Sequence, residues 1–516
     1  MSDKPLQHGG GQSDERVVPM KDPNKGGQPL AEGLEGSRSA KENSATPDTD
    51  RTQSRAPVSQ GLSGVRQAAR RDGKMRFTAL LHHVTERLLL DSYYALNRQA
   101  ATGVDRVTWQ EYGQGVEERI QDLHGRIHRG GYRAQPSLRI YIPKADGRKR
   151  PIGIAALEDK VVQQAVRMVL EAIWEEEFLS FSYGFRPGRG AHDALDALEV
   201  ALTRKKVNFV LDMDIRGFFD NLDHEWMMKF VEHRVADPRM QRLIRKWLKA
   251  GVSEDGNWSE TKVGTPQGAV ISPLLANIYL HYVLDQWVQS WRKKKARGDV
   301  IIVRYADDAV MGFQYREEAE RLLEELQGRM RKFGLELHPE KTRLIEFGRY
   351  AAERREKHGE GKPETFDFLG FTHICGKNRK TKQFTVRRKT VAKRLTTKLK
   401  DIKQKLTRRM QQGTDRTGDW LQSVVQGYLN YHAIPGNYPA LHLFRREVIR
   451  HWWMALRRRS QRSRYRWEKF ERLVERWIPK AKILHPYPHV RFDVKHPRQE
   501  PCAVMPLARI CAGGAQ

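Results

Sequence analysis

Two apolar runs on either side of a short acidic turn form the clearest pattern in the chain. Residues 300–305 and 309–313 are rich in β-branched and other apolar side chains, and Asp307 and Asp308 lie between them. Runs of this length around a tight turn predict a β-hairpin that is buried on at least one face. Two neighbouring carboxylates at its tip repel each other, so one would take up a proton unless a cation lay between them.

A second predicted strand ends in another carboxylate. Residues 208–215 alternate so that Asp212 and Asp214 share one face of a strand, while apolar side chains fill the other face. Residues 216–221 then break the strand and start a turn. Asp214 is therefore placed at the C-terminal end of the strand, where it can meet the hairpin tip. The alternative is a strand end that is simply solvated.

The three carboxylates Asp214, Asp307 and Asp308 are candidate catalytic residues and metal ligands. Hard oxygen ligands suit Mg²⁺, which usually takes one or two protein carboxylates and completes its shell with water and substrate phosphate. Carboxylates that converge from separate elements match a two-metal nucleotidyl-transfer site, so two Mg²⁺ ions are the expected cofactor. For the 307–308 pair the alternative is an acidic turn without function, because Asp is common in turns.

The rest of the pattern predicts an α+β fold in four segments. Residues 1–72 have few large apolar side chains and cannot offset the entropy of ordering, so a disordered polar tail is expected. Alternating helices and short strands are expected over 73–375. A basic, helical, Trp- and Arg-rich region follows over 376–480, and a basic, Pro-rich segment covers 481–516.

Composition points to a polyanionic partner. The 516 residues include 93 Lys and Arg against 63 Asp and Glu, a formal net charge of +30. A surplus of this size is typical of proteins that release counterions from nucleic acid. No apolar stretch is long enough to span a bilayer, so no membrane partner is expected. Cys375, Cys502 and Cys511 form no Cys-x-x-Cys pair, which disfavours a structural zinc site and a disulfide framework.

The motifs occur in an order that resembles reverse transcriptases. Residues 214–219, then 264–268, then 305–308 are similar to successive motifs of those enzymes. More closely, the chain resembles the reverse transcriptase/maturase proteins encoded by bacterial group II introns, over residues from about 75 to the C-terminus. Supporting segments are 101–105, 141–144, 150–153, 182–187, 338–342 and 366–371. The resemblance implies a right-hand polymerase fold with fingers and palm and an α-helical thumb/maturase domain.

This resemblance implies an RNA-directed DNA polymerase that binds its group II intron RNA, assists its splicing and copies it into cDNA during intron mobility. The expected partners are the intron RNA, an RNA template, a DNA primer or target and dNTPs. The expected location is the bacterial cytoplasm, as a ribonucleoprotein. Many such proteins end in a His-Asn-His-type endonuclease with paired cysteines, and its absence here predicts no second-strand DNA cleavage. The oligomeric state stays open.

The resemblance also implies a nucleotide site. Phe219, five residues after Asp214, would exclude a 2′-hydroxyl, and this spacing favours Asp214 over Asp212 as the metal ligand. The alternative is that Phe218 and Phe219 both belong to the core. The expected nucleotide contacts are Lys144, Arg150, Phe219, Gln267, Gly268 and Lys341.

The expected local structure around these contacts differs from one to the next. Residues 141–150 read as a hairpin whose cations can clamp phosphate, and a basic surface hairpin lying on nucleic-acid backbone is the alternative. Residues 264–268 precede a helix that Ser272 can cap. Lys341 is expected near the leaving pyrophosphate, with a salt bridge at a strand edge as an equal alternative.

Two further sets complete the candidate residues. Phe368, Leu369 and Gly370 resemble the primer grip, a hairpin that holds the primer 3′ end. Arginines interleaved with aromatics suit backbone clamping and stacking on unpaired bases, and the candidate RNA-binding residues are Arg457, Arg458, Arg459 and Arg462. Trp452 recurs at helical spacing with apolar residues and is expected in the core.

Two other functional interpretations remain. The first is an RNA-binding splicing cofactor without polymerase activity, and the second is another reverse transcriptase type, such as a retron or diversity-generating enzyme. The presence of all three carboxylates disfavours the first, and the long thumb-like region disfavours a retron.

Overall fold

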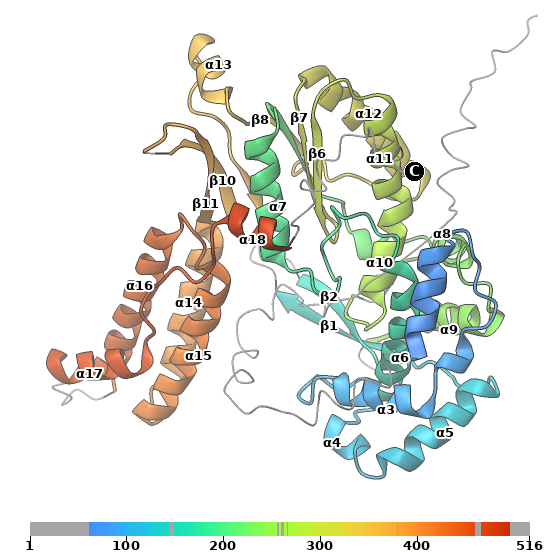
Figure 1. Ribbon diagram of the computed structural model, residues 1–516. Coiled ribbons are helices and arrows are strands. Elements are labelled where there is room, and N and C mark those ends of the chain that lie inside the picture. The colour runs from blue at the N-terminus through green and yellow to red at the C-terminus, as the bar shows by residue number, and fades with distance from the viewer. Residues whose placement is uncertain are drawn as a thin grey trace, which may run out of the picture.

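The computed structural model describes residues 61–143, 149–254, 257–259, 263–265, 267–378, 380–459 and 466–495. Within these residues, three β-sheets lie among helices in a mixed α+β arrangement (Figure 1). No described helix has both the length and the apolar character needed to cross a membrane.

A four-stranded antiparallel sheet, the central sheet, carries the expected hairpin. Its strand order is β6-β7-β3-β8. The bounds are β3 (Phe209–Met213), β6 (Val300–Tyr305), β7 (Asp308–Phe313) and β8 (Arg343–Glu346). Alternation along β3 puts Leu211 and Met213 into one hydrophobic cluster and Val210 into another, so both faces of the sheet are covered. Helix α12 (Arg316–Lys332) packs on the first face and α7 (Ala191–Arg204) on the second.

The N-terminal part is largely helical and surrounds the buried helix α6 (Leu157–Trp174). Residues 61–71 form a helix in which Val65 and Ala69 are buried, so the tail expected over 1–72 was drawn too long. These two apolar side chains join the core of the following helices. Residues 1–60 lie outside the described residues. The other elements are η2 (Leu81–His83), α3 (Glu86–Ala95), α4 (Trp109–Tyr112), α5 (Val116–His128), β1 (Ser137–Pro143) and β2 (Lys149–Ile154).

The stretch of chain between β3 and β6 is mainly helical. Ser272 is the first residue of α10 and does not cap it; its hydroxyl instead lies 2.7 Å from the Thr265 hydroxyl. The expectation of a Ser272 cap was therefore wrong. The elements are η3 (Phe218–Asp220), α8 (His224–Glu232), α9 (Pro238–Lys249), β4 (Val252–Glu254), β5 (Asn257–Ser259), α10 (Ser272–Leu280), the π-helical turn η4 (His281–Asp285) and α11 (Gln286–Lys294).

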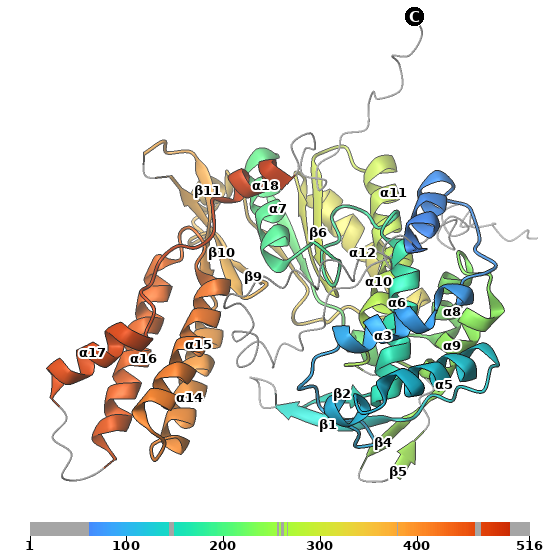
Figure 2. The ribbon, with the colours of Figure 1, turned by 60° about the horizontal axis from the view of Figure 1, so that its bottom comes forward.

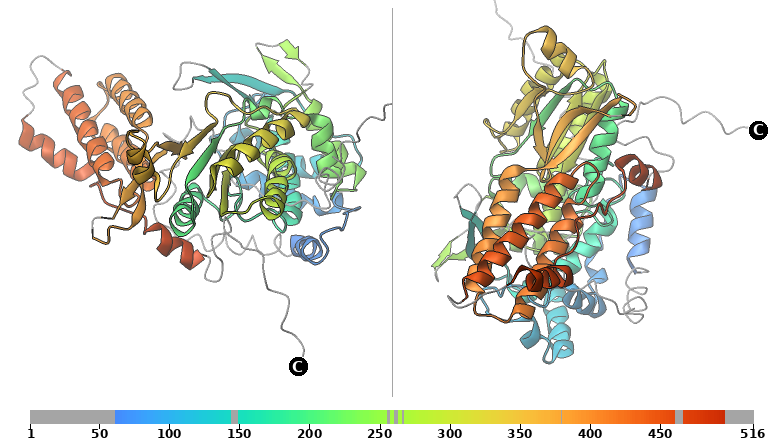
Figure 3. Two further views of the ribbon diagram at one scale, coloured as in Figure 1. Left: turned by 90° about the horizontal axis from the view of Figure 1, so that it is seen from above. Right: turned by 90° about the vertical axis from the view of Figure 1, so that its left-hand side faces the viewer.

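The C-terminal helices form a bundle with its own core, and Figures 2 and 3 show this bundle beside the central sheet. A three-stranded sheet of order β11-β10-β9 joins the two parts. Because β10 and β11 form one hairpin, the expected boundary at residue 375 falls inside a strand. The elements are α13 (Ala351–Lys357), β9 (Phe366–Phe368), β10 (Phe371–Lys377), β11 (Phe384–Thr390), α14 (Ala392–Arg408), α15 (Thr414–His432), α16 (Tyr438–Arg457) and α17 (Trp467–Trp477).

The chain then returns to the central sheet. Helix α18 (Pro488–Lys495) lies along α7, with Phe492 buried in the cluster beneath the sheet. Arg491 forms an ion pair with Asp196 at 2.7 Å. The segment after residue 480, expected only to be basic and Pro-rich, thus contains a helix that packs the C-terminal part on α7.

Candidate active site

The register of the central sheet brings the candidate carboxylates to one edge. Strand β3 pairs with β7 so that Met213 lies opposite Ala309. In an antiparallel pair the next step places Asp214 beside Asp308, and the turn residue Asp307 precedes it. Residues opposite each other in such a pair have Cβ atoms about 5 Å apart. Two segments that are distant in the sequence therefore end at the same place.

The backbone of Asp214 is held by the loop before β8. The His338 amide donates to the Asp214 carbonyl at 2.8 Å, and the Thr342 hydroxyl lies 3.3 Å from the same oxygen. The Lys341 ammonium reaches the Asp214 carboxylate at 2.6 Å, with the lysine side chain 52% exposed. Lys341 thus belongs to the site, and the salt bridge that was its alternative is formed with the candidate catalytic carboxylate itself.

Asp212 lies one pleat further from the edge than Asp214. It is opposite Arg343 of β8, and the two side chains are 3.8 Å apart. Burial raises the pKa of Asp212 to about 6, with Asp367 and Asp214 adding repulsion and Arg343 opposing the shift. Asp212 is therefore a largely buried carboxylate, ion-paired with Arg343 and set back from the position of Asp214 at the edge.

The donor set has the chemistry that Mg²⁺ requires, since carboxylate oxygens are its usual protein ligands. Among the described residues, however, no three His, Cys, Asp or Glu side chains are gathered closely enough to hold a metal ion. What the structure brings together is the backbone positions of Asp214, Asp307 and Asp308, with Lys341 on the first of them.

The loop of residues 264–268 connects two parts of the site. The Thr265 amide donates to the Phe219 carbonyl at 2.9 Å, and the Gly153 amide of β2 donates to the Gln267 carbonyl at 2.8 Å. Gly268 has φ +115°, and a Cβ there would lie 2.8 Å from the Ile152 side chain. Only glycine allows this approach of the loop to β2, and Thr265 joins the same loop to the backbone of Phe219.

The two phenylalanines of the turn after β3 differ in exposure. Phe218 is 3% exposed and belongs to the main core, whereas Phe219 is only partly buried and packs against that core. Their ring centroids are 5.3 Å apart in an edge-to-face contact. The expectation that both could be core residues therefore fits Phe218 alone.

The hairpin expected to clamp phosphate is described only at its strands. Strands β1 and β2 are antiparallel, and Arg150 lies opposite Ile142 near the turn end of β2. The two strands have the pairing expected of a hairpin. Lys144 and the turn itself, residues 144–148, lie outside the described residues.

The candidate primer grip is a two-residue hairpin between β9 and β10. Phe368 pairs with Phe371, and the turn residues Leu369 and Gly370 have φ of +47° and +82°. Positive φ at both turn positions matches the twist of the strands but strains a leucine. The Tyr431 hydroxyl of α15 donates to the Leu369 carbonyl at 2.8 Å, which holds the turn against the bundle. Sequence reasoning did not single out this role of Tyr431.

The candidate RNA-binding arginines lie at the end of α16. Arg457 and Arg458 are exposed, and the Arg457 guanidinium lies 5.9 Å from the Trp453 ring. Arg459 donates to the Gln412 carbonyl at 2.7 Å and so also fastens the helix end. Arg462 lies outside the described residues. Trp452 is 0% exposed, so it is a core residue as expected.

Arg304 is a residue of the site that sequence reasoning missed. It directly precedes Tyr305, is 0% exposed, and contacts the turn that carries Asp307. A single arginine inside an otherwise apolar run is the signal that could have found it, because a fully buried charge requires partners.

The sequence is similar to a reverse transcriptase domain and to proteins encoded by or acting on introns. A family model described as "Reverse transcriptase (RNA-dependent DNA polymerase)" matches residues 142–373. Protein YkfC of Escherichia coli (strain K12) is 33% identical over 333 residues, which cover 56% of this chain and 87% of that protein. The group II intron-encoded protein LtrA of Lactococcus lactis subsp. cremoris is 41% identical over 179 residues, 34% of this chain and 29% of LtrA. Nuclear intron maturase 3 of Arabidopsis thaliana is 30% identical over 140 residues, 27% of this chain and 19% of that protein.

The chain thus spans most of YkfC but less than a third of LtrA and of the maturase. The matched domain implies the right-hand polymerase fold, and the enzymes that carry it bind RNA templates and generally use divalent metal ions. All the candidate carboxylates, and the loop of residues 264–268, fall inside the matched range. This chain belongs to the reverse transcriptase family, and within it to the group II intron reverse transcriptase/maturases.

Proposed function

We propose that the protein synthesises DNA on an RNA template at the edge of the central sheet, with Asp214, Asp307 and Asp308 as ligands of two Mg²⁺ ions. The observation that carries this proposal is the β3–β7 register, which leads Asp214 and Asp308 to neighbouring positions. When bound, the ions would activate the primer 3′-hydroxyl and neutralise charge on the triphosphate. The chain's own residues would bind and orient the primer, the template and the nucleotide.

The parts of the molecule can be assigned to a right hand on this basis. The central sheet with α7 and α12 would be the palm, and the sheet of β1 and β2 with the N-terminal helices would be the fingers. The bundle of α14 to α17 would be the thumb/maturase domain. The grip turn at Leu369 supports this division, because it joins the palm side to α15 through Tyr431.

The side chains around the edge would position the nucleotide. Phe219 is partly exposed and could present its ring to the sugar, where one additional oxygen at the 2′ position would clash. Gln267 and Gly268 contact β2 within the loop whose Thr265 amide donates to the Phe219 carbonyl, so they would border the base and sugar. Arg150, and Lys144 in the hairpin turn, would contact the triphosphate as cations.

Lys341 would act on the leaving group. Its ammonium is 2.6 Å from Asp214 and its side chain is 52% exposed, so it can turn toward a bound triphosphate without crossing the core. A cation at that place neutralises charge that develops on the pyrophosphate and can donate a proton to it. Lys341 would leave the Asp214 carboxylate and bind the triphosphate each time a nucleotide is added.

The RNA partner would be the protein's own group II intron, within a ribonucleoprotein in the bacterial cytoplasm. The net charge of +30, the exposed Arg457 beside Trp453 and the exposed Arg458 support binding to structured RNA. The ribozyme would supply the splicing chemistry, and the protein would hold its fold.

The test is primer extension by the purified full chain. A DNA primer annealed to an RNA template is incubated with Mg²⁺ and dNTPs, and Asp308→Asn serves as the matched variant. Extension by the wild type and at least about a 100-fold loss in the variant are expected, because removal of one metal ligand removes a major part of transition-state stabilisation. RNA binding without any extension by the wild type would instead identify a splicing cofactor that lacks polymerase activity.

A further inference from the structure

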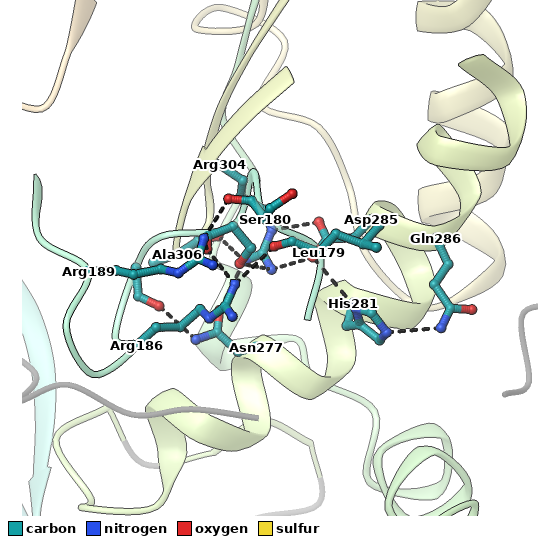
Figure 4. Close-up of polar contacts among 12 residues, drawn as sticks. Leu179, Ser180, Arg186, Arg189, Asn277, His281, Asp285, Gln286, Arg304 and Ala306 are labelled. Carbon is teal, nitrogen blue, oxygen red and sulfur yellow. Dashed lines mark hydrogen bonds and ion pairs between the residues drawn. The ribbon is translucent and has the colours of Figure 1, made fainter. Parts of the chain in front are cut away.

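A fully buried ion pair lies directly behind the acidic turn. Arg304, the second-last residue of β6, and Asp285 of η4 are both 0% exposed. The Arg304 Nε and Nη2 atoms donate to the two carboxylate oxygens of Asp285 at 2.7 and 2.6 Å (Figure 4). This is a bidentate contact, the strongest geometry available to the two groups.

The remaining donors of Arg304 are also occupied. Nη1 donates to Asn277 Oδ1 at 3.0 Å and to the Ala306 carbonyl at 2.8 Å, while Nη2 also donates to Ser182 Oγ at 2.7 Å. A guanidinium carries five N–H groups in a fixed planar fork. Each of them therefore has an acceptor, and the plane of Arg304 is fixed by atoms from several segments.

Among these acceptors, the Ala306 carbonyl oxygen belongs to the acidic turn itself. Ala306 lies in the turn between β6 and β7 and has φ +56°, a region that an alanine rarely adopts. Backbone held in this way is strained and persists only where its surroundings enforce it. Asp307 and Asp308 follow immediately, so the orientation of this peptide sets the direction of both carboxylates.

The other side of the same turn is held by Gly184. A Cβ on Gly184 would lie 2.2 Å from the Ala306 nitrogen, so the two backbones touch. Asn277 donates through Nδ2 to the Gly184 carbonyl at 2.8 Å while accepting from Arg304. Asn277 thus joins the two supports, and the turn is fixed from its carbonyl side and its amide side together.

We infer that Arg304, oriented by Asp285, is a positioning residue of the polymerase reaction: through the Ala306 carbonyl it sets where the Asp307 and Asp308 carboxylates stand relative to Asp214. This inference rests on the proposed function. Arg304 is 0% exposed and so does not touch substrate. A buried ion pair is often no more stabilising than an apolar pair of similar volume, so stability alone does not account for it.

Lysine cannot replace Arg304 in this arrangement. An ammonium has three donors that radiate from one atom, whereas the acceptors here are spread around a plane. Arg304→Lys would keep the charge opposite Asp285 but lose the contact that holds Ala306. The turn would then relax, and a shift of about 1 Å at a reacting group can cost about 100-fold in rate.

The experiment compares Arg304→Lys with a matched variant, Arg234→Lys. Arg234 is also 0% exposed, donates to the Gly73 carbonyl at 2.8 Å and forms an ion pair with Glu177, and both of these partners lie outside the acidic turn. For each full-length protein, kcat and KM for dNTP are measured in primer extension, with the Kd for primer–template and the melting temperature. Arg304→Lys is expected to lower kcat about 100-fold, with the Kd for primer–template within about twofold of wild type. Arg234→Lys is expected to lower the melting temperature similarly and to keep kcat.

Ser182→Ala provides a milder variant should Arg304→Lys not fold. It removes one acceptor of Arg304 and leaves the charges in place, and about a tenfold lower kcat is expected, from the looser guanidinium. Folded Arg304→Lys or Ser182→Ala protein with wild-type kcat would overturn the inference. So would an equal loss of kcat in Arg234→Lys, which would show a general effect of stability. Absence of extension by the wild type would refute the proposed function, and the inference with it.

Discussion

Asp212→Asn tests whether Asp212 of β3 and Asp214, which directly follows the strand, have different roles. Asp212 has a side chain only 20% exposed, and burial raises its pKa from the ordinary value of 3.8 to about 6. The Asp367 and Asp214 carboxylates add to the shift, while Arg343 opposes it. The ionised form of Asp212 is therefore disfavoured in the folded state, although its neighbour at the edge is proposed to bind metal.

The sign and size of the effect follow from linkage. Because the folded state holds the proton more tightly, stability falls as pH rises from about 4 to about 6, and the full cost is present above that window. The difference between 3.8 and about 6 corresponds to at most about 3 kcal/mol, at about 1.4 kcal/mol per pKa unit. Asparagine has nearly the same shape and no charge, so Asp212→Asn should recover part of this cost at pH 7.5 and none at pH 4.

The assay is urea unfolding of wild type and Asp212→Asn at pH 4 and at pH 7.5, with primer extension at pH 7.5. The variant is expected to unfold at higher urea concentration at pH 7.5, to match wild type at pH 4, and to retain most of its polymerase activity. Asp214→Asn, the matched variant two residues further along the chain, is expected to lose that activity. Lower stability of Asp212→Asn at pH 7.5, or equal losses of activity in the two variants, would refute this reasoning.

Three further predictions concern separate parts of the molecule. Lys341→Gln frees the Asp214 carboxylate, so it should lower the Mg²⁺ concentration for half-maximal rate while lowering kcat about 100-fold, measured by Mg²⁺ titration of primer extension. Phe219→Ala removes the proposed clash with a 2′-hydroxyl, so incorporation of NTPs relative to dNTPs should rise about tenfold or more in competition assays. Arg491→Ala removes one of the ion pairs of the buried Asp196, so the free energy of unfolding should fall by about 1–3 kcal/mol in urea titrations; no change would show that α18 does not stabilise the fold.

The strands of the central sheet and their acids could be predicted from the sequence because a β-strand has a period of two. That period assigns Asp212 and Asp214 to one face and marks the end of the strand, and the apolar runs at 300–313 predict the hairpin. The pairing of β3 with β7 confirms that the two acidic segments end together. The pattern does not contain the register itself, which depends on how both faces of the sheet are covered.

Contacts between distant segments could not be predicted from the sequence, because they too depend on tertiary packing. The partners of Arg304 come from η4, α10 and the loop before α7, and no local pattern joins these segments. The helix over 61–71 fully buries only Val65 and Ala69, with Leu62 and Ala68 packed against the same core, too few apolar residues to stand out from a polar tail. Ser272 has the right residue type for a cap, but Thr265 offers its hydroxyl a partner and the helix begins one residue earlier than a cap requires.

The acidic residues of α7 show how a strongly basic chain attaches its own basic segments. Asp193, Asp196 and Glu199 follow one another at a spacing of three along α7, so they form a stripe on that helix. Arg388 of β11 pairs with Asp196 at 3.1 Å and with Glu199 at 2.9 Å, and Lys495 of α18 pairs with Asp193 at 2.7 Å. The stripe thus receives cations from the sheet that precedes the bundle and from the helix that follows it. Because α7 also packs on the central sheet, the same helix contacts both the sheet that carries the candidate carboxylates and the segments on either side of the bundle, so a displacement of α7 would be felt by both.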